Sequence, residues 1–127
     1  MYEYNAVVTD VHDGDTITVD LDLGLDTWRR DFHVRLYGGN ARELKDVGGE
    51  EAHANLSALL PLGSRVVIRS YKAGRDVEPD KYGGRYLASV TLPDGRDLAT
   101  LLIEQQWLAP WDGKGARPLP PWPRKIP

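Results

Sequence analysis

Apolar and polar positions alternate along most of the first third of the chain. In residues 16–23 every second position is apolar, namely Ile17, Val19, Leu21 and Leu23. Such alternation is typical of a half-buried β-strand, because successive side chains of a strand point to opposite faces. Residues 5–11 and 28–37 are predicted to be strands as well, with Arg35 on the polar face of the second. The first third therefore predicts a three-stranded meander.

Beyond residue 37 the spacing of apolar residues is mixed. The expected elements are a glycine-rich loop over 38–49, a helix over 50–60, a strand over 64–71, a polar loop over 72–84, a strand over 85–92 and a helix over 98–106. Glu50 and Glu51 suit the first turn of the earlier helix, Pro61 ends it, and Asp97 is expected to cap the later one. The inward residues are predicted to be Ala52, Leu56 and Leu59 or Leu60 for the first helix, and Leu98, Leu101, Leu102 and Leu108 for the second.

The order of these elements, βββ-α-ββ-α, predicts a mainly β protein with helices (an α+β fold), built as a five-stranded OB-fold barrel. Closing the barrel would remove the edges that five short strands otherwise expose. Residues 1–111 form the expected domain. Residues 112–127 are so rich in Pro and Gly that we expect a tail without regular structure, either extended on the surface or mobile.

Composition narrows the function classes. The chain has 127 residues, no cysteine and three histidines that lack the spacing of a helical metal pair. This composition argues against a disulfide framework and against thiolate or histidine zinc sites. These residues contain no apolar run long enough for a membrane span and no export signal. The default expectation is a cytoplasmic monomer without a membrane partner.

Charge is unevenly distributed, although the net charge is only −3. Residues 1–26 contain seven acidic residues and no Lys or Arg, whereas residues 27–127 contain 12 acidic and 16 basic residues, a local balance of +4. An acidic hairpin on a cationic body suits a metal ion at one place and a polyanion at another. The simpler alternative, which charge alone favours, is that the hairpin acids only keep an exposed face soluble.

Three short stretches carry candidate chemistry. Residues 11–16 (VHDGDT) place two carboxylates around a turn glycine, which suits Ca²⁺ but is also common in ordinary hairpins. Residues 35–43 (RLYGGNARE) offer a forked guanidinium for phosphate oxygens and a carboxylate that can serve as a base. Residues 80–88 (DKYGGRYLA) deliver a second arginine at the start of a strand. Taken singly, each stretch also fits a solvated turn, a loop or a surface ion pair.

In this order, the three stretches resemble the staphylococcal nuclease (thermonuclease) family. The family pattern is Asp-Gly-Asp-Thr, then Arg-Leu-x-Gly-x-Asp-Ala-Pro-Glu, then Asp-Lys-Tyr-Gly-Arg, and the resemblance covers roughly residues 5–111. It implies an OB-fold enzyme, a Ca²⁺-dependent nuclease that hydrolyses phosphodiester bonds of DNA and RNA. In such enzymes water attacks phosphorus and the 5′-oxygen leaves, which gives 3′-phosphate products.

The resemblance also implies a calcium site. Asp15 matches the first calcium ligand of the family, and Asp13 matches the preceding acid of the same motif, close to the metal. Asn40 stands where a second calcium carboxylate is expected. The backbone carbonyl of Ala41 matches the group that completes the metal shell.

The remaining matched positions concern the substrate. Glu43 matches the acid proposed as general base for the attacking water. Arg35 and Arg85 match the two arginines that hold the scissile phosphate, where they would neutralise the charge that grows in the transition state. Lys81 and Tyr82 match residues near the terminal phosphate and the base of the nucleotide.

The chain also departs from the family pattern. Asn40 replaces a carboxylate, so the affinity for Ca²⁺ should be lower. Arg42 replaces a proline, and Gly84 is an extra residue before the second arginine. Trp111 lies near the position of a base-stacking tyrosine and can stack on a base, whereas we expect Trp107 to pack in the core.

Three interpretations remain open on sequence grounds. The first is an active Ca²⁺-dependent nuclease, because both arginines and the base are retained. The second is a catalytically weakened module of the same fold that binds nucleic acid or a protein partner, which Asn40 and Arg42 favour. The third is an interaction domain that presents its proline-rich tail to a partner.

Overall fold

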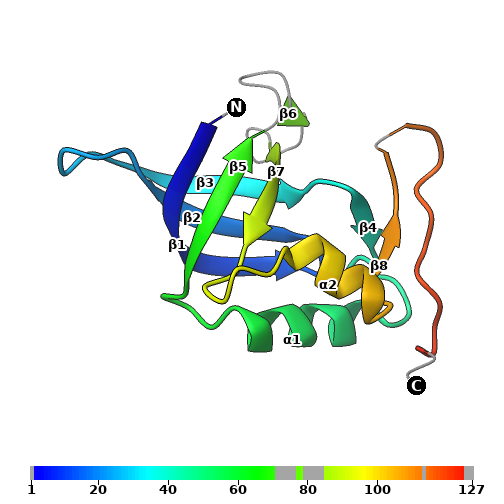
Figure 1. Ribbon diagram of the computed structural model, residues 1–127. Coiled ribbons are helices and arrows are strands. Elements are labelled where there is room, and N and C mark those ends of the chain that lie inside the picture. The colour runs from blue at the N-terminus through cyan, green and yellow to red at the C-terminus, as the bar shows by residue number, and fades with distance from the viewer. Residues whose placement is uncertain (1, 71–76, 79–84, 113, 125–127) are drawn as a thin grey trace.

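The computed structural model describes residues 2–70, 77–78, 85–112 and 114–124. Figure 1 shows the strands and helices formed within these residues. The strands are β1 (Tyr2–Asp13), β2 (Thr16–Asp22), β3 (Trp28–Leu36), β4 (Gly39–Ala41), β5 (Arg65–Ser70), β6 (Val77–Glu78), β7 (Arg85–Thr91) and β8 (Leu108–Pro110). The helices are α1 (Gly49–Leu59) and α2 (Leu98–Glu104). Within the described ranges, neither helix is long and apolar enough to cross a membrane.

Five of the strands close into a barrel (Figure 1). Antiparallel pairing gives the order β3-β2-β1-β5-β7, and a parallel pairing of β3 with β7 closes the ring, with Arg35 opposite Leu87. The predicted five-stranded OB-like barrel with two helices is confirmed. The pairing of β2 with β3 also joins the β1–β2 turn to the end of β3, because the Leu36 backbone N–H donates to the Asp15 carbonyl at 2.9 Å.

Alternate residues of the barrel strands fill its interior. The residues with no exposed surface include Val8, Ile17, Val19, Val34 and Val90. The prediction that Leu23 points inward was wrong: Leu23 follows the end of β2, where the β2–β3 hairpin projects from the barrel, and it is 46% exposed. Thr18, expected on an open polar face, is instead buried, with its Oγ1 3.0 Å from Nδ1 of His33. At this point β2 is therefore covered on both faces.

Helix α1 lies across one end of the barrel (Figure 1). Its predicted apolar stripe is buried at Ala52, Leu56 and Leu60. Leu59 is only partly buried. Glu50 and Glu51 occupy the first turn, where carboxylates interact favourably with the helix dipole.

Helix α2 begins as predicted but ends earlier. The Asp97 carboxylate accepts a hydrogen bond from the Thr100 backbone N–H at 3.0 Å, which is the expected N-cap. The helix ends at Glu104, because Gln106 adopts a left-handed φ of 63° that a helix cannot continue. Leu108 is buried as expected but belongs to β8.

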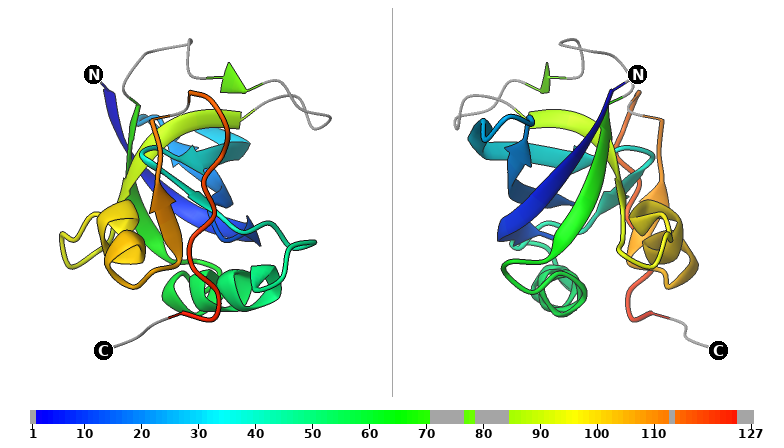
Figure 2. Two further views of the ribbon diagram at one scale, coloured as in Figure 1. Left: turned by 90° about the vertical axis from the view of Figure 1, so that its right-hand side faces the viewer. Right: turned by 60° about the vertical axis from the view of Figure 1, so that its left-hand side comes forward.

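The predicted loop over 38–49 contains a short strand. This strand, β4, pairs with β8, with Asn40 opposite Ala109. Three residues are too few to show an alternating pattern, so the sequence could not reveal the strand. The pairing fixes the segment that carries Asn40 beside the segment that leads into the tail, and Figure 2 shows the tail running alongside this small sheet.

Candidate functional site

The turn between β1 and β2 consists of Gly14 and Asp15 and lies against α1 and β4. Gly14 does not have a positive φ. A Cβ atom on Gly14 would lie 2.9 Å from the Cβ atoms of both Ala41 and Ala52. Glycine is therefore needed for close packing, and not for the left-handed conformation that an Asp-Gly hairpin pattern usually indicates.

The Asp15 carboxylate is buried and has a separate partner for each oxygen. Oδ2 accepts a hydrogen bond from the Ala41 backbone N–H at 2.9 Å, and Oδ1 accepts one from Thr16 Oγ1 at 3.0 Å. Arg35 Nη2 lies 3.6 Å from Oδ2, and the side chains of Arg35 and Asp15 are only 1% and 7% exposed, respectively. The fold thus brings together Asp15, Arg35 and Ala41, three of the predicted site residues, from separate segments.

The pKa of Asp15 is raised from 3.8 to about 6. The largest cause is burial, which disfavours the charged form, followed by the charge of Asp13 and a hydrogen bond with it. Arg35 and the Ala41 N–H act in the opposite direction. Asp13 is itself buried, and its Oδ1 accepts a hydrogen bond from the Asp15 backbone N–H at 3.2 Å. The two carboxylates form a buried negative site that Arg35 compensates only in part.

A hard cation fits this pair of carboxylates. Ca²⁺ prefers charged and carbonyl oxygens, and its charge would offset both the burial of Asp15 and its repulsion by Asp13. Among the described residues, no group of three or more His, Cys, Asp or Glu side chains is arranged for a metal. Backbone carbonyls, such as that of Ala41, and water would therefore have to complete the shell.

Asn40 bridges Arg35 and the tail. Its Oδ1 accepts a hydrogen bond from Arg35 Nη2 at 2.8 Å, and its Nδ2 donates one to the Pro118 carbonyl at 2.9 Å. The side chain is buried. The amide oxygen is therefore already engaged by an arginine, and a role of Asn40 as a calcium ligand stays a prediction.

Glu43 lies between β4 and α1, and its side chain is 44% exposed. Lys45 Nζ and Arg117 Nη1 each lie 3.5 Å from one of its carboxylate oxygens. The Glu43 backbone N–H donates to Asp46 Oδ2 at 2.9 Å, which holds the turn. Water can therefore reach this carboxylate, although two cations flank it.

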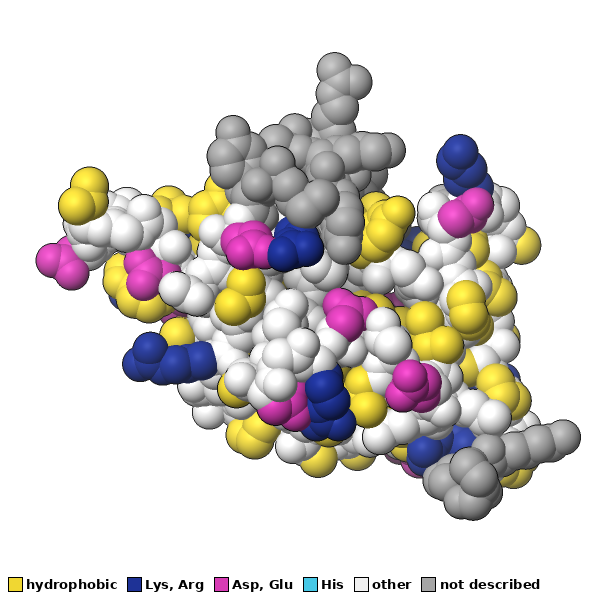
Figure 3. Space-filling view, viewed as in Figure 1, with side chains coloured by type: hydrophobic (Ala, Val, Ile, Leu, Met, Phe, Trp, Pro, Cys, Tyr) yellow, Lys and Arg dark blue, Asp and Glu magenta, His cyan; other side chains and the backbone are white. Residues whose placement is uncertain are grey.

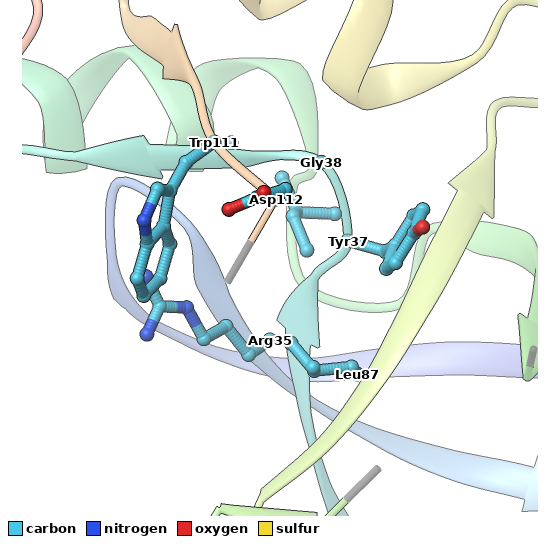
Figure 4. Close-up of a pocket in the computed structure, with 8 residues that line it drawn as sticks. Arg35, Tyr37, Gly38, Leu87, Trp111 and Asp112 are labelled. Carbon is cyan, nitrogen blue, oxygen red and sulfur yellow. The ribbon is translucent and has the colours of Figure 1, made fainter. Parts of the chain in front are cut away.

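Trp111 covers the guanidinium of Arg35 (Figure 4). The guanidinium carbon of Arg35 lies 5.0 Å from the centroid of the Trp111 ring, and that of Arg117 lies 5.5 Å from it. A small cavity of about 50 Å³ adjoins this contact, and its lining residues are Arg35, Leu36, Tyr37, Gly38, Gly39, Leu87, Trp111 and Asp112. A cavity of this size has room for a few water molecules but not for a nucleotide. Stacking of a base on Trp111 would therefore require the ring or the tail to shift.

Of the predicted residues Arg85, Lys81 and Tyr82, only Arg85 belongs to a described strand. Arg85 begins β7, two residues before Leu87, which is opposite Arg35 in the β3–β7 register. The two predicted phosphate-binding arginines therefore belong to neighbouring strands, although the side chain of Arg85 lies outside the described part. Lys81 and Tyr82 also lie outside the described residues.

The sequence did not reveal that the tail contributes to this site. The Pro120 carbonyl accepts a hydrogen bond from Arg42 Nε at 3.0 Å, close to where Pro118 accepts from Asn40. Composition separated the tail from the domain at residue 112. A signal was present nonetheless: a proline-rich segment has few N–H donors but keeps its carbonyl acceptors, which suits a surface rich in Asn and Arg donors.

The surface charge is mixed. On the face shown in Figure 3, acidic and basic side chains of the described residues are interspersed and do not form one continuous basic band. A polyanion that binds at this face would therefore be held more by individual hydrogen-bond donors than by a broad field of positive charge.

No protein-family model matches this chain, and no curated protein matches it either. The functional interpretation therefore rests on the three sequence stretches and on the geometry of the site. That geometry consists of a barrel with a buried cluster of acids, arginine and asparagine at one end.

Proposed function

We propose that this protein is a Ca²⁺-dependent nuclease that hydrolyses phosphodiester bonds of DNA or RNA. One observation carries the proposal: the pairing of β2 with β3 and the turn into β4 bring Asp15, Arg35 and Asn40 to within ion-pair or hydrogen-bond distance. The motif resemblance assigns these positions to metal and phosphate binding. A buried ion pair is weak evidence of a stabilising role, so stability alone does not explain why these charged groups are gathered.

The proposed roles follow from the chemistry of each group. Asp13 and Asp15, with the Ala41 carbonyl, would hold Ca²⁺, which when bound supplies positive charge beside the phosphate. Arg35 offers forked donors that match phosphate oxygens and would neutralise negative charge in the transition state once its face is uncovered.

Glu43 is the proposed general base, because its carboxylate is open to water. It accepts a proton from the attacking water while the water oxygen bonds to phosphorus. The bond from phosphorus to the 5′-oxygen breaks, and this oxygen takes a proton from solvent. The products are a 3′-phosphate and a 5′-hydroxyl, and Glu43 returns its proton to solvent.

A second candidate is a non-catalytic module that binds nucleic acid or a protein partner. It is favoured by the burial of Arg35, whose side chain is 1% exposed and whose Nη2 donates to Asn40. An arginine held in this way can organise the end of the barrel without any substrate.

Digestion of a single-stranded oligonucleotide separates the two candidates. The protein should release 3′-phosphate ends with Ca²⁺ and none with a chelator. Glu43→Gln should slow cleavage about 100-fold or more, the usual contribution of a general base. Glu50→Gln, a control that removes an exposed carboxylate from the first turn of α1, should leave the rate unchanged. Absence of cleavage at every Ca²⁺ concentration would exclude the nuclease, and an unaffected Glu43→Gln variant would exclude Glu43 as the base.

A further inference from the structure

The described part of the tail, residues 114–124, crosses the candidate site (Figures 1 and 2). Two of its carbonyls accept hydrogen bonds from site donors: Pro118 from Asn40 Nδ2 at 2.9 Å, and Pro120 from Arg42 Nε at 3.0 Å. Amide and guanidinium N–H groups are also the donors that a phosphate oxygen would use. The tail therefore occupies two donors beside Arg35 that could otherwise bind phosphate oxygens.

The tail and the residue that leads into it also contact two charged side chains of the site, Glu43 and Arg35. Arg117 Nη1 lies 3.5 Å from Glu43 Oε1, which places a cation beside the proposed base. Trp111 lies over the Arg35 guanidinium, whose side chain is 1% exposed. In this arrangement Arg35 cannot reach a phosphate in solvent, so substrate binding requires the covering groups to move.

A second set of contacts holds the tail beyond the site, and we call it the distal anchor. The Arg124 guanidinium carbon lies 3.7 Å from the centroid of the Trp107 ring, and Arg124 Nε donates to the Gln105 carbonyl at 3.0 Å. The Trp122 ring packs on Gly48, where an added Cβ would lie 2.6 Å from Trp122 Cδ2. None of these contacts involves a residue proposed to bind metal or phosphate or to act as the base.

We propose that the tail is an autoinhibitory strap that closes the phosphate site and must be displaced by the substrate. The proposal rests on the proposed function, since Arg35, assigned to phosphate binding, lies under the residue that leads into the tail, and Glu43, assigned as the base, is paired with Arg117 of the tail. Proline residues suit this role, because an extended proline-rich segment needs few partners for its own N–H groups and presents carbonyls to the donors of the site. The strap and a phosphodiester would then compete for the same groups.

Competition of this kind has a measurable consequence. If only a fraction of the molecules is open, the apparent dissociation constant for the substrate is raised in inverse proportion to that fraction. Weakening the distal anchor should raise the open fraction without altering any group that contacts the substrate. Loss of a positive charge alone would weaken binding to a polyanion, so tighter binding after removal of an arginine is a distinctive result.

The test compares full-length Arg124→Ala with Arg96→Ala. Arg96 is an exposed arginine paired with Asp94 in a turn, away from the tail. The binding of a labelled single-stranded oligothymidylate is measured by fluorescence anisotropy with a chelator present, and the initial rate of its cleavage is measured with Ca²⁺. Arg124→Ala should bind roughly three- to tenfold more tightly, as expected for the loss of one cation–π contact with its hydrogen bond, and should cleave faster. Arg96→Ala should behave like the wild type.

The outcomes separate the strap from the nuclease. A folded Arg124→Ala protein that binds no more tightly than the wild type overturns the strap, even if both proteins cleave. Tighter binding without cleavage by either protein supports the strap and overturns the nuclease, whereas neither binding nor cleavage by either protein overturns both. Trp122→Ser provides a second change in the distal anchor, and it should shift binding in the same direction if Arg124→Ala does not fold.

Discussion

Two arginine–carboxylate pairs of nearly equal length occupy very different environments. Arg35 lies 3.6 Å from Asp15 with the two side chains 1% and 7% exposed, whereas Arg117 lies 3.5 Å from Glu43 with the side chains 41% and 44% exposed. Both arginines also lie against Trp111. The first pair belongs to the end of the barrel and the second ties the tail to a loop. Burial, and not distance, decides which pair is fixed and which can separate.

The same substitution in each pair should produce the largest contrast. Arg35→Met leaves the buried Asp15 with less compensation and the Asn40 oxygen without its donor, so the free energy of unfolding should fall by about 3 kcal/mol or more. Arg117→Met removes an exposed pair and should cost less than about 1 kcal/mol. Urea unfolding of both variants measures the difference. Equal losses of unfolding free energy in the two variants would show that the burial of the Arg35–Asp15 pair does not make it more important for stability than the exposed Arg117–Glu43 pair.

The buried pair should also make stability depend on pH. The folded-state pKa of Asp15, about 6, lies above the unfolded value of 3.8, so the native protein binds this proton more tightly than the unfolded chain does. The resulting stabilisation is full below about pH 4 and is lost as pH rises through 6, by up to roughly 3 kcal/mol without Ca²⁺. Asp15→Asn should lose this component when unfolding is compared at about pH 4.5 and about pH 7.5. Identical pH dependence in both proteins would show that Asp15 is not the group responsible.

The sequence predicted the barrel because its strands follow a simple physical rule. The alternation in residues 16–23 matches β2, and the apolar stripe of α1 is buried at Ala52, Leu56 and Leu60. The rule fails where an element is too short to show alternation, or where a residue is buried by a segment that is distant in the sequence. Strand β4 lies where the sequence predicts a loop, and Thr18 belongs to a strand face that the alternation predicts to be open but that is covered.

Less of the candidate site could be predicted. The sequence predicted Asp15 as a metal ligand and Arg35 as a phosphate ligand, but their proximity depends on the register of β2 with β3, which places Thr16 opposite Arg35. The contacts of Pro118 and Pro120 with the site join residues 78 positions apart. A carbonyl that accepts from a distant side chain leaves no trace in local composition, so the sequence predicted a tail that is extended on the surface or mobile, but not its contacts with the site.

Calcium binding at Asp15 and Asp13 tests the central claim most directly. Calorimetric titration of chelator-treated protein at about pH 7.5, above the Asp15 pKa of about 6, needs neither substrate nor turnover. The wild type should bind Ca²⁺ at one site, Asp15→Asn should bind at least about tenfold more weakly, and Asn40→Asp should bind more tightly because it adds a charged ligand. Unchanged affinity in Asn40→Asp would remove only Asn40 from the ligand set. Affinity in Asp15→Asn equal to that of the wild type, or no binding by the wild type, would contradict a calcium site at this end of the barrel.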